Sequence, residues 1–187
     1  MQHSQDPFAL LGVERRFDLD LKALEKTHRE LSRALHPDKF AQAGASERRA
    51  VLEKAASVNE AWRTVRDPIK RAEALFQLAG LKVGEDNEPK ASTAFLMEVL
   101  DEREALSDAR AAMDLAKVRA VGETMTRRAD ATQKKLADGF AAVAAGQSAG
   151  AAPDHATVEK LVPLLGELRF YKRFLDEVAA IEEENDT

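Results

Sequence analysis

The sequence of 187 residues contains no cysteine, and it is poor in aromatic residues, glycine and proline. The absence of cysteine excludes structural disulfides, cysteine nucleophiles and thiolate metal ligands, and it is consistent with a reducing compartment. Because glycine and proline are scarce while Ala, Leu, Glu, Lys and Arg dominate, most of the chain has good helix formers. We therefore predict an all-α fold.

The chain also lacks a basic surplus and a long apolar run. Its formal net charge of -5 disfavours nucleic-acid binding, which usually needs a basic surface. No stretch approaches the roughly 18–20 apolar residues of a membrane span, and residues 1–5 do not resemble the start of a signal peptide. We expect a cytoplasmic protein that binds neither membrane nor nucleic acid.

The sequence gives no sign of catalytic chemistry. The four histidines are scattered without the spacing of metal ligands, so we expect no metal and no cofactor. Acidic residues are plentiful, but nothing gathers them into an apolar cleft, and we expect no enzymatic activity. The basic residues between 117 and 135 are expected to form a solvated helix face.

Residues 1–80 contain the signals of a capped helical hairpin. Asp6-Pro7 begins a short helix that Gly12 ends, and Asp67-Pro68 begins a linking helix that runs to about residue 79. Between them lie two stripes with helical spacing, one ending before Pro37 and one beginning near Ser46. The stripes are Leu21, Leu24, His28, Leu31 and Leu35, then Val51, Ala55, Val58, Trp62 and Val65.

Residues 81–91 combine glycine, asparagine and proline with charges and are predicted to be a linker. Beyond them, residues 92–187 predict a bundle of three antiparallel helices, at about 93–116, 117–144 and 154–184, with a loop at 146–153. The expected organisation is therefore a first part at 1–80, a linker at 81–91 and a second part at 92–187, together elongated or L-shaped.

The sharpest local signal is LHPDKF at residues 35–40, between the two hairpin helices. Pro37 ends the first helix and fixes the backbone, so that His36 and Asp38 are displayed at a rigid corner. Lys26, Arg29 and Arg33 lie on the helix that leads to this corner, off its leucine stripe, where they can attract an acidic surface. Alternatively, the tripeptide is an ordinary helix-ending turn without a partner.

Several segments together resemble the HscB family, the J-type co-chaperones of bacterial iron–sulfur cluster biogenesis. They are ALLGV at 9–13, LHPDKF at 35–40, VNEAW at 58–62, RAE at 71–73 and AFLME at 94–98, while RDP at 66–68 resembles the end of a J-domain. The resemblance covers most of residues 6–110. It implies a J-domain that docks on an HscA-type heat-shock chaperone and stimulates its ATPase. The implied contact residues are His36, Pro37, Asp38 and Lys39, with Lys26, Arg29 and Arg33.

A second surface follows from helical geometry in the second part. Phe95, Val99 and Leu106 share one face and belong in the core, whereas an apolar strip with an acidic edge lies opposite. The resemblance implies that this strip binds an IscU-type scaffold protein. Its residues are Leu96, Met97, Leu100, Asp101, Glu104 and Asp108, with Phe170 from the last helix. Asp101 and Asp108 stand where the longer Glu is expected from the family. Alternatively, both sides of this helix are covered within the chain.

Two other functions remain open at this point. A general J-protein would deliver unfolded clients, although the chain lacks the Gly/Phe-rich segment and cysteine-based zinc module often found in such proteins. A coiled-coil dimer would pair the long helices between chains. The resemblance favours a monomeric adaptor that delivers a scaffold to a chaperone.

Overall fold

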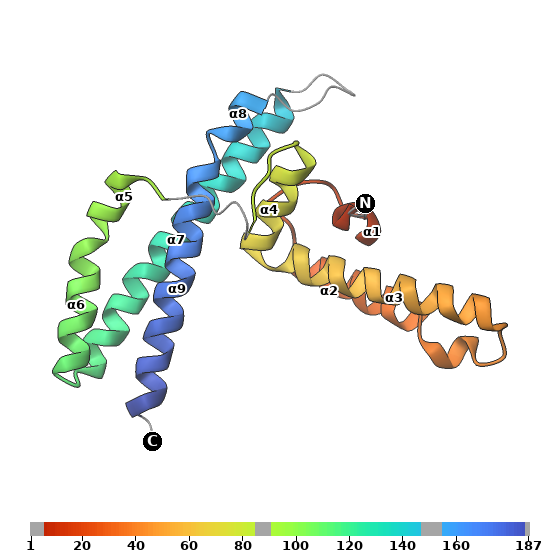
Figure 1. Cartoon of the computed structure of the whole chain (residues 1–187), viewed down its shortest axis with the longest axis horizontal. Helices are drawn as coiled ribbons and strands as arrows, with labels where there is room; N and C mark the ends of the chain where they lie inside the picture. The colour runs from red at the N-terminus through yellow and green to blue at the C-terminus, as the bar shows by residue number, and fades with distance from the viewer. Residues whose placement is uncertain (1–5, 85–90, 147–154, 186–187) are drawn as a thin grey trace. The chain divides into compact units, whose positions relative to one another are not determined.

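The computed structural model describes residues 6–84, 91–146 and 155–185 (Figure 1). Its regular elements are helices, so the predicted all-α class is confirmed. The chain divides into two compact units, Met1–Gly80 and Leu81–Thr187. No helix in the described part of the chain is long and apolar enough to span a membrane.

The first unit begins with the short helix α1 (Pro7–Leu11). The Asp6 side chain caps it by accepting a hydrogen bond from the backbone N–H of Phe8 at 2.9 Å. Gly12 ends it in the left-handed conformation, with φ of 67°, which glycine adopts without a steric penalty. Phe8 and Leu11 are buried against the hairpin that follows.

The hairpin consists of α2 (Leu21–Ala34), a 3₁₀ turn η1 (Pro37–Phe40) and α3 (Ala45–Arg66), and α4 (Pro68–Leu78) follows directly. The ring of His28 on α2 stacks on Trp62 of α3, with centroids 5.0 Å apart and planes inclined by 9°. His28 Nε2 also lies 3.0 Å from Asn59 Oδ1. From its place in the leucine stripe, His28 is predicted to be a partly buried core histidine or a stacking group; it is half-buried and stacked, and the stack joins the two helices.

Burial in the hairpin is concentrated at the end near α1 and α4. On α3, the buried residues are Val58, Ala61 and Val65, and on α2 only Leu24 is buried. The residues of both stripes nearer η1 are only half-buried, because this end packs two helices and a turn without a third layer. The tip of the hairpin is thus held mainly by the local geometry of its turn.

Arg71 on α4 is the charged residue buried in this unit, with 5% of its surface exposed. Its guanidinium lies over the ring of Phe17, 4.8 Å from the centroid. Burial lowers the pKa of Arg71 below its ordinary value, while the carboxylates of Asp67 and Asp18 act in the opposite direction. The side chain therefore ties the loop before α2 to the start of α4.

The second unit contains α5 (Thr93–Glu98), α6 (Leu100–Ala111), α7 (Leu115–Ala145), α8 (His155–Glu159) and α9 (Val162–Asn185). The long helices α7 and α9 pack along each other, and α6 packs against α7 (Figure 1). The predicted core positions Phe95, Val99 and Leu106 are buried. Phe95 packs against Phe170 and Tyr171 of α9, and α6, which carries Leu106, packs against α7.

Two helices expected to be continuous are broken. The helix expected at about 93–116 divides at Val99 and ends at Ala111, where Met113 takes a left-handed φ of 54°. The last helix divides between α8 and α9, because Pro163 has no N–H to continue the hydrogen-bond ladder. Pro163 is a sequence signal that the pattern-based prediction overlooked.

Smaller corrections concern helix ends and the core stripe of α9. The second hairpin helix begins at Ala45 after Gly44, one residue before the expected Ser46. The apolar spacing of the last helix predicts a core stripe of Leu164, Leu168, Tyr171, Leu175 and Val178. Leu168, Tyr171 and Val178 are buried, but Leu164 and Leu175 are only half-buried. Leu165, Phe174 and Ile181 fill the core instead. The expected linker at 81–91 and loop at 146–153 lie largely outside the described residues.

Candidate docking surfaces

The His36-Pro37-Asp38 turn follows directly from the chemistry of its residues. Pro37 cannot donate a backbone hydrogen bond, so α2 ends with the N–H of Leu35 bonded to the carbonyl of Leu31 at 3.0 Å. The chain then forms η1, in which the N–H of Lys39 donates to the carbonyl of His36 at 3.0 Å. Backbone hydrogen bonds thus define the turn, while the side chains of His36, Pro37 and Asp38 are exposed.

The imidazole of His36 caps the start of this turn through its Nδ1 atom. Its Nδ1 accepts a hydrogen bond from the backbone N–H of Asp38 at 3.3 Å and lies 3.5 Å from the carboxylate of the same residue. In the neutral ring the proton is then on Nε2, which is left to donate to a partner. The corner presents a donor from His36 and an acceptor from Asp38 in adjacent positions.

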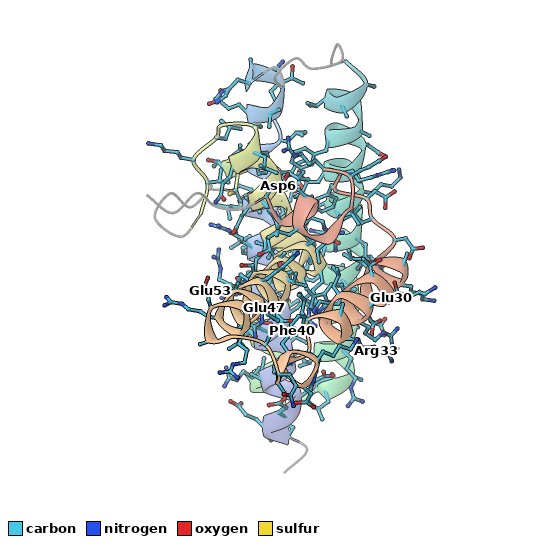
Figure 2. All side chains as sticks on the ribbon, turned by 90° about the vertical axis from the view of Figure 1, so that its right-hand side faces the viewer. Asp6, Glu30, Arg33, Phe40, Glu47 and Glu53 are labelled. Atoms are coloured by element: carbon cyan, nitrogen blue, oxygen red, sulfur yellow. The ribbon has the colours of Figure 1, made fainter. Side chains whose placement is uncertain are left out.

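A cationic stripe leads along α2 to the turn. Lys26, Arg29 and Arg33 are spaced by three and four residues, so they share one face of the helix, and all three are exposed. Glu25 lies 3.9 Å from Arg29, an exposed pair that holds the guanidinium only weakly. Figure 2 shows Arg33 on the side of the hairpin opposite Glu53. The face is suited to an acidic partner surface.

The α5–α6 face exposes three large apolar side chains. The exposed fractions are 47% for Leu96, 66% for Met97 and 54% for Leu100. Neighbouring Phe95 and Val99 are buried, so the division into an inner and an outer side matches the expectation from helical spacing. A cluster of exposed leucine and methionine side chains is typical of surfaces that bind other proteins, so this face is a candidate docking surface.

The charged residues of α6 fall into two groups. Glu102, Arg103 and Arg110 form ion pairs with α7 and α9, through Arg128, Glu177 and Glu184 respectively. The other group continues the apolar strip along the helix, is exposed, and has no ion pair among the described residues: Asp101, Glu104 and Asp108. Intramolecular pairing therefore leaves one acidic strip beside the exposed apolar residues.

Phe170, the predicted contribution of α9, lies partly inside the bundle. Its ring meets the buried ring of Phe95 edge to face, with centroids 5.4 Å apart, and it also contacts Phe174. It is half-buried, so part of its ring remains accessible. The structure thus places Phe170 behind α5, where it supports Phe95; its contact with a partner stays a prediction.

The sequence did not single out Arg128, which was expected on a solvated face of α7. Its guanidinium instead pairs with Glu102 and donates to the backbone carbonyl oxygen of Glu98 at 3.3 Å. Beneath it, Tyr171 is buried against Phe95, and Thr132 donates to Glu167 at 3.1 Å. Burial and then Glu167 raise the pKa of Tyr171, while Arg128 opposes them.

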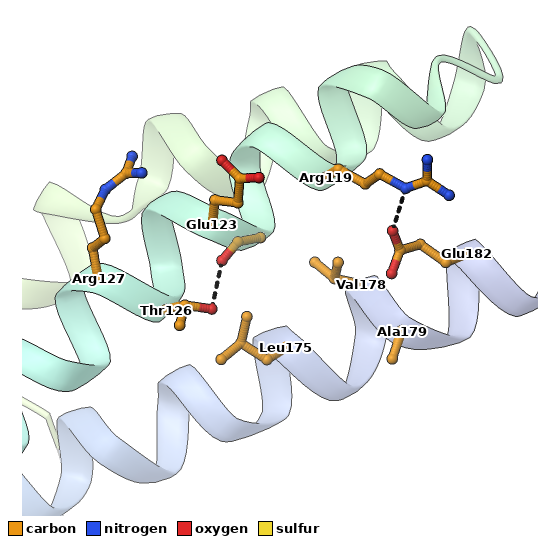
Figure 3. Close-up of a pocket in the computed structure, with 9 residues that line it drawn as sticks. Arg119, Glu123, Thr126, Arg127, Leu175, Val178, Ala179 and Glu182 are labelled. Carbon is orange, nitrogen blue, oxygen red and sulfur yellow. Dashed lines mark hydrogen bonds and ion pairs between the residues drawn. The ribbon is translucent and has the colours of Figure 1, made fainter.

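A groove between α7 and α9 lies apart from the predicted residues. Gly122 is among the residues that line it. Figure 3 shows the apolar side chains of Leu175 and Val178 on α9 and the charged side chains of Glu123 and Arg127 on α7. Arg119 and Glu182 close one end with an ion pair of 2.9 Å. In the described part of the chain, no cluster of histidine and acidic residues has the arrangement of a metal site.

Comparison with known proteins supports one family. Residues 91–179 match the family model described as the HSCB C-terminal oligomerisation domain. Proteins named co-chaperone protein HscB homolog from Paraburkholderia phymatum and Aromatoleum aromaticum are 40% and 44% identical over 108 residues. Each alignment covers 58% of this chain, and the two cover 62% and 61% of the respective relatives. The chain therefore matches about three fifths of the length of these relatives.

Solved structures match over a larger part of the chain. Chaperone HscB from Vibrio cholerae has a TM-score of 0.76 and 26% identity, covering 96% of this chain and 99% of that one. The human co-chaperone protein HscB has a TM-score of 0.78 and 20% identity, and the match covers 97% of this chain and 84% of the human chain. This likeness shows that the two chains share a fold. The resemblance first seen in the short motifs is confirmed.

Proposed function

We propose, on the premise that this chain carries the C-terminal domain of the HscB family and the HscB fold, that it is a co-chaperone of iron–sulfur cluster assembly. In this role the first unit stimulates the ATPase of an HscA-type chaperone, and the second unit delivers an IscU-type scaffold to it. The observation that carries the proposal is that the two units expose chemically different surfaces, a cationic stripe with the His36 corner on the first and an apolar face with an acidic strip on the second.

The first surface acts by binding and performs no chemistry of its own. The cationic stripe of α2 steers the unit toward an acidic surface of the chaperone, and the His36 corner then makes directed hydrogen bonds. Stimulation requires that these contacts are stronger with the chaperone conformation that hydrolyses ATP, because equal affinity for both conformations shifts nothing. The bond cleavage takes place in the chaperone.

The second surface selects the client. Leu96, Met97 and Leu100 would bury against an apolar patch of the scaffold, and the acidic strip beside them would meet basic residues at its edge. The cluster itself is cargo: with no cysteine in the chain, the thiolate ligands come from the scaffold. A protein with both surfaces raises the local concentration of scaffold at the chaperone.

The deciding experiment measures steady-state ATP hydrolysis by an HscA-type chaperone with and without this protein and the scaffold. We expect stimulation by the wild type, a further rise with scaffold, and loss of both with His36→Gln. His155→Gln is the matched control, because His155 is exposed on α8, outside both surfaces. Equal stimulation by unrelated unfolded polypeptides would instead identify a general J-protein, and no stimulation by folded wild type would overturn the proposal.

The scaffold surface is tested separately by calorimetric titration with the scaffold. Leu96→Ala combined with Met97→Ala should weaken binding by roughly ten- to a hundredfold, because both side chains are exposed and free to be buried by a partner. Leu52→Ala with Met113→Ala removes comparable exposed apolar groups elsewhere and should leave affinity unchanged. Unaltered affinity in the first variant would eliminate this face.

A further inference from the structure

The scaffold-docking face of the proposed function is formed by two helices that meet at a break. Leu96 and Met97 belong to α5, whereas Leu100 is the first residue of α6. Val99 between them has φ of -100° and ψ of 2°, outside helical geometry, although its N–H still bonds to the carbonyl of Phe95 at 3.2 Å. The relative direction of the three exposed side chains therefore depends on the angle at Val99.

A break of this kind exposes backbone groups that helical bonding no longer satisfies. One of them is the carbonyl of Glu98, the last residue of α5. Arg128 of α7 donates from Nη1 to this oxygen at 3.3 Å. The same guanidinium pairs through Nη2 with Glu102, in the first turn of α6. One side chain thus bonds to the helix on each side of the break.

Partial burial distinguishes this contact from the other ion pairs of α6. The exposed side-chain fractions are 37% for Arg128 and 17% for Glu102, against 53% and 60% for Arg110 and Glu184. Water competes less for a pair that is partly shielded, and a planar guanidinium holds two acceptors in fixed directions. The Arg128 contact is therefore a stronger geometric constraint than the exposed pairs.

The inner side of the same region is fixed by packing. Phe95 anchors α5 through edge-to-face contacts with Phe170 and Tyr171, and Leu106 anchors α6 in the core. These anchors hold each helix against the bundle, but neither lies at the junction. Val99 itself is buried at the junction, with 1% of its surface exposed, and Arg128 adds a hydrogen bond to Glu98 on one side of it and an ion pair with Glu102 on the other.

We infer that Arg128 is a positioning residue for scaffold binding: it sets the angle between α5 and α6 so that Leu96, Met97 and Leu100 form one surface. It does not touch the partner itself. Its contribution is preorganisation, since a junction that is already fixed does not have to be ordered when the scaffold binds. This inference rests on the proposed function, because it concerns the same docking face.

The test compares Arg128→Met with Arg119→Met in the full chain. Both residues lie on α7 and pair with a glutamate of another bundle helix, but Arg119 pairs with Glu182 of α9, away from the α5–α6 junction. Scaffold titration should show about tenfold weaker binding for Arg128→Met and wild-type binding for Arg119→Met. In the ATPase assay, the scaffold concentration for half-maximal stimulation should rise, while stimulation at saturating scaffold and without scaffold stays unchanged.

Two further variants separate positioning from general stability. Glu102→Gln removes the same ion pair from its other end, so its effect and that of Arg128→Met should not add in the double variant. Arg128→Lys keeps the positive charge but loses the planar guanidinium that reaches two acceptors at once, so its affinity for the scaffold should lie between those of wild type and Arg128→Met. Methyl NMR shifts of Leu96 and Leu100 should change in Arg128→Met and not in Arg119→Met, with thermal midpoints recorded for every variant.

The outcomes distinguish this inference from the proposed function. If wild type does not bind the scaffold, the proposed function fails. If wild type binds, and the Leu96/Met97 double variant is weakened while Arg128→Met and Glu102→Gln bind normally, only the role of Arg128 is overturned. Arg128→Met could lower both the thermal midpoint and the affinity, in which case a loss of stability would explain the weaker binding. The Glu102→Gln variant then decides, because normal binding by that variant contradicts the inference.

Discussion

The two proposed docking surfaces differ in how the chain builds them. The corner of the first unit lies within consecutive residues, and its hydrogen bonds join His36 to residues two and three positions away. The α5–α6 face of the second unit depends on partners far along the chain: Arg128 reaches Glu98 across 30 positions, and Arg103 reaches Glu177 across 74. A local surface survives changes elsewhere in the fold, whereas a face held by distant helices is only as well defined as the bundle.

The chain offers a separate intrinsic probe for each unit. Its single tryptophan, Trp62, lies on α3 of the first unit, and its single tyrosine, Tyr171, lies on α9 of the second. Tryptophan fluorescence and tyrosine absorbance therefore follow the two units independently. If the contrast between a local and a distributed surface holds, a change in the core of one unit shifts the signal of that unit's probe alone.

The largest effect is expected from Phe95→Ala. The side chain is 5% exposed and contacts two aromatic rings, so its removal should lower the free energy of unfolding of the bundle by about 3–5 kcal/mol. Urea unfolding should show an earlier transition by tyrosine absorbance and an unchanged one by Trp62 fluorescence. Scaffold binding should fall, while ATPase stimulation without scaffold persists. Parallel movement of both transitions would show that the units do not unfold separately.

A smaller effect, on the other unit, is expected from His28→Ala. The substitution removes the stack on Trp62 and the hydrogen bond with Asn59, and it should cost the first unit about 1–2 kcal/mol. The fluorescence transition should move to lower urea while scaffold affinity is retained. His155→Ala serves as the control on an exposed histidine. A His28→Ala variant with an unmoved transition would mean that the stack contributes nothing to joining α2 and α3.

Alkaline pH should affect the second unit through Tyr171. Burial, followed by the charge of Glu167, raises the pKa of this phenol above its ordinary 10.0 in the folded state. A raised folded pKa favours the neutral form, so this contribution to stability is complete below the unfolded pKa of 10.0 and is lost as pH rises through the folded value. Ultraviolet titration of the folded protein should give a pKa above that of the urea-unfolded chain. Equal values would contradict the burial of this group.

The smallest effect is expected at the turn between α6 and α7. Met113 is 77% exposed and holds a φ of 54°, which costs energy in any residue with a Cβ. Met113→Gly should raise the stability of the bundle by about 0.5–1 kcal/mol, since glycine takes this conformation without strain. Thermal unfolding followed at Tyr171 measures the gain. Met113→Ala keeps the Cβ, and a similar gain in that variant would rule out relief of backbone strain.

Much of the fold was predictable because its signals are local. Asp6, Gly12, Pro37 and Asp67 mark helix ends through capping or the lack of a donor, and the structure has helix ends at these positions. Helical spacing alone also predicted that Phe95 is buried and Met97 is exposed on opposite sides of the same helix. The break at Pro163 was also predictable, because proline has no N–H to continue a helix. It was missed because the apolar spacing continues through residue 163 and indicated one continuous helix.

What the sequence alone determined is the all-α class, the hairpin with its His36 corner, and the inner and outer sides of the helix bearing Met97, because each depends on backbone chemistry or on a period of 3.6 residues. The tertiary structure decided the break at Val99 and the role of Arg128. The carbonyl that the break frees at Glu98 accepts a hydrogen bond from another helix, and no local pattern reveals which distant arginine supplies it.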